Sequence, residues 1–120
     1  MASKLVVKVM VGANDPERCA QAFTVATTAL AAGIEVSLWL TGEAAWFALP
    51  GRAEEFELPH SAPLSQLLES LLLAGRVTLC TQCAVRRGIE AKDLIPGIVI
   101  AGAASFVEEI MAADTKALVY

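Results

Sequence analysis

The chain has 120 residues, of which 56% are hydrophobic, and its formal net charge at pH 7 is −4. This length favours one domain over residues 1–120. The acidic balance argues against nucleic acid as the main partner, because Lys and Arg form no stripe and only Arg86 and Arg87 are adjacent.

The apolar content exceeds what a small soluble monomer usually carries, with a mean hydropathy of +0.58. No apolar run approaches the roughly 20 residues of a membrane-spanning helix, so we expect no membrane partner. The surplus of apolar side chains is expected at subunit interfaces, which predicts a homo-oligomer. Trp39, Trp46 and Phe47 lie near one another in the sequence and are expected to form an aromatic group in the core or at such an interface.

The N-terminal segment lacks the layout of a secretory signal peptide, and three cysteines is an odd number for a disulfide scaffold. A reducing compartment would keep these cysteines as thiols. We therefore expect a cytoplasmic protein.

The first elements are a strand and a long helix. Residues 5–11 form a β-branched apolar run, which is typical of a strand buried on both faces of a parallel sheet. Asp15-Pro16-Glu17 then marks a helix start, in which Asp15 caps the first turn and Pro16 occupies the first helical position. This helix is expected to run to about Ala32 and to end at Gly33.

The later elements repeat this alternation of strand and helix. We expect strands over 34–40, 76–80, 98–100 and 116–119, helices over 44–49, 64–73, 81–87 and 101–112, and a loop over 50–63. Glu108 and Glu109 are expected on the solvent face of the last helix.

Such alternation predicts βαβ units with right-handed crossovers. The expected fold is a three-layer α/β/α sandwich with a mostly parallel five-stranded sheet. Functional residues should gather at the carboxyl ends of the strands. The loops expected there are residues 12–15, 41–43, 80–83 and 101–104.

Cys80-Thr81-Gln82-Cys83 lies where the strand over 76–80 runs into a helix. The unpaired N–H groups at a helix start favour an anion and should lower the pKa of the Cys80 thiol. A thiolate that forms readily at neutral pH is a nucleophile, so the motif indicates sulfur chemistry.

The segment around Cys80 resembles the active-cysteine segment of the DsrE/TusD-like sulfur-relay proteins, also described as the DsrE/DsrF-like family. The matching residues are Val77-Thr78-Leu79-Cys80 and a short helix that ends in Arg86-Arg87-Gly88-Ile89. Further similar segments are the opening strand, Asp15-Pro16-Glu17, Ala31-Ala32-Gly33-Ile34-Glu35-Val36, Leu40-Thr41-Gly42-Glu43 and Ile100-Ala101-Gly102-Ala103-Ala104. The similarity spans nearly the whole chain.

This resemblance implies a small α/β domain that assembles into trimers or hexamers. It also implies that the strand-end cysteine, which is Cys80 by position, carries sulfane sulfur as a persulfide between a donor and an acceptor protein. The expected function is therefore that of a cytoplasmic sulfur carrier or sulfurtransferase.

Cys83 stands where the relay proteins often have a small apolar residue. It lies one helical turn from Cys80, which leaves open a dithiol redox protein in which both cysteines cycle through a disulfide. No second cysteine pair completes a tetrahedral metal site, and no metal or other cofactor is expected. Cys19 lies among alanines and is expected in the core or at an interface.

Five further residues are candidates for the pocket around Cys80. Thr81 and Gln82 would supply N–H groups or side chains, and Asn14 and Glu43 stand at strand ends that border the same edge. His60, the single histidine, could act as an acid or base, with simple surface exposure as the alternative. A third function also stays open, a non-enzymatic oligomeric binding module whose thiols are incidental.

Overall fold

The computed structural model describes residues 3–120, which form a five-stranded sheet flanked by helices. The strands are β1 (Lys4–Val9), β2 (Glu35–Leu40), β3 (Arg76–Cys80), β4 (Val99–Ala101) and β5 (Thr115–Val119). The helices are α1 (Pro16–Ala31), α2 (Leu64–Ala74), α3 (Thr81–Arg86) and α4 (Ala103–Ile110), with 3-10 helices η1 (Gly42–Ala48), η2 (Ala53–Glu55) and η3 (Ala91–Asp93). Within residues 3–120, no helix is long and apolar enough to cross a membrane.

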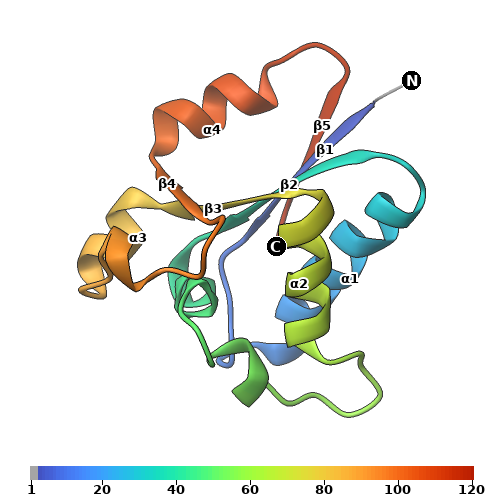
Figure 1. The fold of residues 1–120 in the computed structure, drawn as a ribbon. Coiled ribbons are helices and arrows are strands. Elements are labelled where there is room, and N and C mark those ends of the chain that lie inside the picture. Colours follow the sequence, from blue (N-terminus) through green and yellow to red (C-terminus); the bar gives the residue numbers. More distant parts are fainter. Residues whose placement is uncertain (1–2) are drawn as a thin grey trace.

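The sheet has the strand order β4-β3-β2-β1-β5, and every strand pair is parallel. Helices α1 and α2 cover one face of the sheet and α4 lies over the other (Figure 1). This arrangement confirms the three-layer α/β/α architecture, and the expected mostly parallel sheet is parallel throughout.

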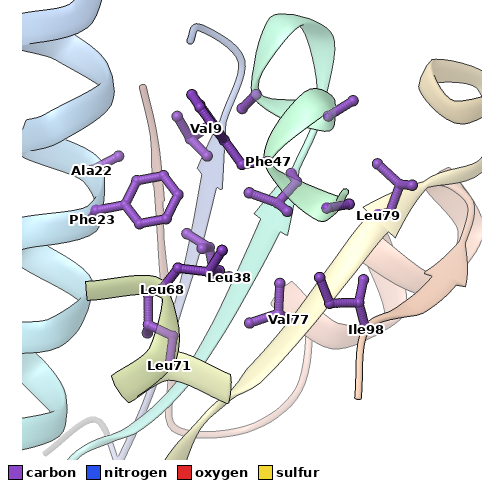
Figure 2. Close-up of a cluster of buried hydrophobic side chains, with 14 of the residues drawn as sticks. Val9, Ala22, Phe23, Leu38, Phe47, Leu68, Leu71, Val77, Leu79 and Ile98 are labelled. Carbon is purple, nitrogen blue, oxygen red and sulfur yellow. The ribbon is translucent and has the colours of Figure 1, made fainter. Parts of the chain in front are cut away.

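The face under α1 and α2 holds the hydrophobic core (Figure 2). Val7, Leu38 and Val77 are paired across three neighbouring strands and point to this face. They are buried together with Phe23 of α1 and Leu71 of α2. The alanines of α1 let the helix approach the sheet closely, so burial of apolar area stabilises this side.

The face under α4 is held by polar contacts, and no residue of α4 is fully buried. The Glu109 carboxylate accepts hydrogen bonds from Ser37 Oγ and Trp39 Nε1, both at 2.8 Å, and lies 3.4 Å from Lys4 Nζ. The expectation that Glu109 faces solvent was therefore wrong, although Glu108 is exposed. Adjacent residues on a helix point about 100° apart, so a charged pair need not share one environment.

The expected aromatic group does not form a single cluster. Trp39 packs edge-to-face on Phe106 of α4, with ring centroids 5.3 Å apart, whereas Phe47 is buried in the core on the opposite face. Trp46 lies under the Arg52 guanidinium at 4.7 Å. Alternation along β2 directs Trp39 away from the core, and this separates it from the residues of η1.

The boundaries of the expected strands and helices agree with the observed ones to within two residues, and the differences concern detail. The segment that follows β2 is a 3-10 helix, and the loop over 50–63 contains the short η2. Asp15 occupies the N-cap of α1 but makes no capping hydrogen bond, and its carboxylate instead lies 3.5 Å from Arg18 Nε.

Candidate functional site

The loops that follow the strands meet around the start of α3, as the sequence predicted. The Glu43 N–H donates to the Met10 carbonyl at 3.3 Å, which joins the ends of β1 and β2. The Gly42 N–H donates to Cys83 Sγ at 3.2 Å, which joins the end of β2 to α3. A Cβ at Gly102 would lie 3.7 Å from Thr81 Oγ1, so the β4–α4 connection closes the same region.

The connections that leave the carboxyl edge of the sheet lead to both of its faces. Those after β1 and β2 lead to α1 and α2 on one face, whereas the connection after β4 leads to α4 on the other (Figure 1). Cys80 ends β3 and pairs with Ala101 of β4 at this point. In open parallel sheets, ligands bind outside the carboxyl ends of the strands, so Cys80 lies at the edge of the sheet at which the topology favours a site.

Cys80 is the N-cap residue of α3 and is partly exposed. In the thiol form its sulfur makes no capping hydrogen bond and donates weakly toward Gln82 Oε1 at 3.6 Å. Partial burial raises the pKa of this thiol, but hydrogen bonding from the Cys83 N–H, the Cys83 side chain and the Gln82 N–H, together with the charge of Lys8, outweighs it and lowers the pKa. The direction agrees with the sequence expectation.

The cause of this shift is more local than a helix dipole. With six residues, α3 is too short to build a large macrodipole. The groups that favour the anion are the individual N–H donors of its first turn, which have no partner within the helix.

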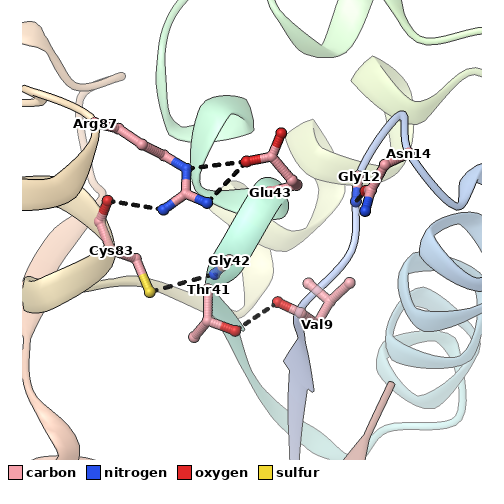
Figure 3. Close-up of polar contacts among 8 residues, drawn as sticks. All are labelled: Val9, Gly12, Asn14, Thr41, Gly42, Glu43, Cys83 and Arg87. Carbon is pink, nitrogen blue, oxygen red and sulfur yellow. Dashed lines mark hydrogen bonds and ion pairs between the residues drawn. The ribbon is translucent and has the colours of Figure 1, made fainter.

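Cys83 belongs to the first turn of α3, is 7% exposed and points its sulfur toward Gly42 at the start of η1 (Figure 3). Arg87 fastens this helix to η1, because its guanidinium donates to the Cys83 carbonyl at 3.2 Å and to Glu43 Oε2 at 2.8 Å. The hydrogen bond from Arg87 lowers the pKa of the Glu43 carboxyl, so Glu43 is held as an anion in this clamp.

The structure does not link two of the expected pocket residues to the thiol. Asn14 Oδ1 accepts the Gly12 N–H at 2.9 Å and so stabilises the turn after β1. His60 is exposed, with φ of +61°, and lines a shallow depression against α1. Across residues 3–120, neither side chain forms a hydrogen bond or ion pair with Cys80.

Lys8 and Arg87 belong to the site but were absent from the sequence-based candidates. The ammonium of Lys8 lies 5.0 Å from the centroid of the Phe106 ring on the α4 face. The sequence signal for Lys8 was a single charge within the otherwise apolar run over residues 5–11. The signal for Arg87 was its position four residues after Cys83, which places both on one side of a helix.

The third thiol is much harder to ionise than Cys80. Cys19 is fully buried in the core, and burial, with a further contribution from Asp15, raises the pKa of its thiol to about 12. The expected core packing of Cys19 is thereby confirmed. In the described part of the chain, no three His, Cys, Asp or Glu side chains are placed to hold a metal ion.

Comparisons with known proteins agree with this architecture. The uncharacterized protein MJ0760 of Methanocaldococcus jannaschii is 30% identical over 96 residues, which are 79% of this chain and 35% of that protein. The chain thus spans about a third of the length of this relative.

Two solved structures share the fold. The YchN protein from E. coli has a TM-score of 0.78 and 22% identity, with both chains covered completely. The protein of unknown function MTH1491 from Methanobacterium thermoautotrophicum has a TM-score of 0.70 and 12% identity over 98% of each chain. The family model of the DsrE/DsrF-like proteins matches residues 3–116. Because that match covers nearly the whole chain, this protein belongs to the DsrE/DsrF-like family.

Proposed function

We propose that this protein is a small sulfur carrier in which Cys80 holds sulfane sulfur as a persulfide. Membership of the DsrE/DsrF-like family supports a protein of the sulfur-relay type in general. The observation that carries the specific proposal is the contrast among the three thiols: Cys19 and Cys83 are buried, whereas Cys80 is partly exposed and its pKa is lowered.

The proposed transfer consists of two balanced displacements. The Cys80 thiolate attacks the outer sulfur of a donor persulfide, the donor S–S bond breaks, and the donor leaves as a thiolate. An acceptor thiolate then attacks the outer sulfur of the Cys80 persulfide, and Cys80 leaves as a thiolate again. No net oxidant or reductant is consumed.

The surroundings of Cys80 suit both steps, because each step begins or ends with an anion on its sulfur. The N–H groups of Cys83 and Gln82 and the ammonium of Lys8 favour that anion. Fixed donors of this kind stabilise developing charge without having to reorganise during the reaction.

The buried position of Cys83 favours sulfur carriage over dithiol cycling. A resolving thiol must reach the sulfur of a mixed disulfide. Cys83 Sγ instead accepts the N–H of Gly42 at the start of η1, and Arg87 holds α3 against η1.

We further propose that copies of the chain assemble through the α4 side of the sheet, as trimers or hexamers. Exposed apolar side chains lie on α4 and at its C-cap, where Val107 is 53% and Met111 77% exposed. Burial of such side chains against a second copy would stabilise an assembly. Because the free thiols need a reducing environment, we place the protein in the cytoplasm.

Mass spectrometry after incubation with glutathione persulfide tests the carrier function. We expect a gain of one sulfur atom on Cys80, and its transfer to an added acceptor thiol. Cys80→Ser should abolish the gain, whereas Cys19→Ser, the matched control at a buried thiol, should retain it. A wild-type protein that gains no sulfur on Cys80 would reject the proposal.

A further inference from the structure

A cavity of about 210 Å³ is lined by residues of η1 and η2, and Cys80 does not take part in its wall. Three aromatic rings line this cavity, those of Trp46 and Phe47 in η1 and of Phe56, which follows η2. The rings of Phe47 and Phe56 meet edge-to-face, with centroids 5.8 Å apart. The wall therefore offers apolar surface to a ligand at a place separate from the thiol.

The size of the cavity limits what it can hold. Sites for drug-sized ligands usually enclose roughly 300–1,000 Å³. A cavity of about 210 Å³ suits a smaller molecule, of the size of a single amino acid. Because aromatic rings gain most by covering apolar surface, the body of such a molecule should be apolar.

The mouth of the cavity carries one cation and one anion that are not paired with each other. Arg52 is the N-cap residue of η2 and Glu55 is its last residue, and both are exposed. The Arg52 guanidinium lies 4.7 Å from the centroid of the Trp46 ring instead of against a carboxylate. Within residues 3–120, neither Arg52 nor Glu55 forms an ion pair. Both charges are thus open to groups of opposite sign on a ligand.

Glu43, the third charged residue of the wall, already has a partner. Its carboxylate accepts hydrogen bonds from Arg87 Nη2 at 2.8 Å and from Arg87 Nε at 3.2 Å. The charges left for recognition are those of Arg52 and Glu55, one of each sign. They favour a ligand that carries both a carboxylate and an ammonium over a ligand that carries only one of them, because a singly charged ligand gains one contact instead of two.

We propose that this cavity binds a small zwitterion with an apolar body, of the chemical class of the apolar α-amino acids. The Arg52 guanidinium pairs with the carboxylate of the ligand, and the Glu55 carboxylate pairs with its ammonium. A guanidinium can stack on a ring with its flat face and donate from its edge at the same time, so Arg52 keeps its contact with Trp46. The apolar side chain of the ligand lies against Phe47 and Phe56.

Calorimetric titration of the wild-type protein tests the ligand class. The probes are L-phenylalanine, 3-phenylpropanoate, which lacks the ammonium, and phenethylamine, which lacks the carboxylate. L-Phenylalanine should bind roughly tenfold more tightly than either analogue, because each analogue loses hydrogen bonds between charged groups. Equal affinities for the three probes would overturn the zwitterion. No binding of L-phenylalanine or L-leucine at millimolar concentration would overturn the site itself.

Nuclear magnetic resonance locates the bound probe through the two tryptophans of the chain, which lie in different environments. L-Phenylalanine should shift the indole N–H resonance of Trp46 and leave that of Trp39, which packs on Phe106, unchanged. A shift of the Trp39 resonance alone would place the probe elsewhere and reject the proposal.

A pair of variants then tests the role of the guanidinium. Arg52→Gln should weaken the binding of L-phenylalanine roughly tenfold. Arg86→Gln is the matched control, because Arg86 is an exposed arginine outside the wall, and it should bind as the wild type does. Cys80→Ser should also bind normally, since the cavity is separate from the thiol. Unchanged affinity in Arg52→Gln, or loss of binding in Cys80→Ser, would contradict the proposed site.

Discussion

The two faces of the sheet are built from the same strands but are stabilised in different ways. On the α1–α2 face, Val7, Leu38 and Val77 pack against fully buried helix side chains. On the α4 face, Glu109 ties an amphipathic helix to the sheet through Ser37 and Trp39. Alternation along each strand thus produces one face that is closed by apolar burial and another that is covered only in part.

Cys80, the thiol proposed to carry sulfur, belongs to the second face. Cys80 and Thr78 alternate with the core residues of β3, and Thr78 pairs with Trp39 beneath α4. The Thr78 hydroxyl is buried and, among the described residues, has no hydrogen-bond partner. This face is therefore less completely packed than the α1–α2 face, which is compatible with the proposed carrier function.

Truncation of the closed face should have the largest effect on stability. Phe23 is fully buried between α1 and the sheet, and Phe23→Ala should lower the free energy of unfolding by about 3–5 kcal/mol. Urea denaturation followed by circular dichroism measures this loss. A loss below that of Glu109→Gln would contradict the ranking of the two faces.

Removal of the polar anchor of α4 should have a smaller effect. Glu109→Gln replaces a charged acceptor of two hydrogen bonds and an ion-pair partner of Lys4, and should cost about 1–2 kcal/mol at pH 7. Glu108→Gln is the matched control, because that side chain is exposed and its substitution should leave stability nearly unchanged.

The same carboxylate predicts a dependence of stability on pH. Partial burial raises the pKa of Glu109, but hydrogen bonds from Trp39 and Ser37 and the charge of Lys4 outweigh it, so the pKa is lowered in the folded state. Its contribution is complete above the unfolded pKa of about 4.3 and is lost as the pH falls toward the lower folded value. Lowering the pH from about 5 to about 3 should therefore reduce the free energy of unfolding of the wild type more than that of Glu109→Gln. Urea denaturation at each pH measures this difference. Equal pH dependence in the two proteins would argue against this anchor.

A charge introduced on the α4 face should have the smallest effect on stability but a large effect on assembly. Val107→Lys should change the free energy of unfolding by less than about 0.5 kcal/mol, because the side chain is 53% exposed. The same variant should lower the molar mass measured by light scattering. Leu73→Lys, at an 81% exposed position of α2, should leave the mass unchanged. A monomeric wild type would reject the proposed assembly.

Much of the fold could be predicted from local patterns. The apolar run of β1, the Pro16 start and Gly33 end of α1, and the Arg76–Cys80 strand are each encoded by neighbouring residues, and the structure confirms them. Cys80 was found in the same way, because a cysteine between a strand and a helix is visible in the sequence. The order of the strands could not be predicted in this way, because strand pairing depends on contacts between distant segments.

The site itself depended on such distant contacts. Gly42 is 41 residues from Cys83, and Glu43 is 44 residues from Arg87, yet both pairs meet above the end of the sheet. Local pattern likewise could not show that Glu109 reaches Ser37 or that His60 lies against α1.

By itself, the sequence determined the alternation of strands and helices and the place of a cysteine between a strand and a helix, because backbone preference and hydrophobic periodicity act over a few residues. The tertiary structure decided which thiol is exposed, which donors surround it and which face of the sheet stays open. Burial and hydrogen bonding between distant segments exist only once the chain has folded, and these interactions distinguish Cys80 from Cys19 and Cys83.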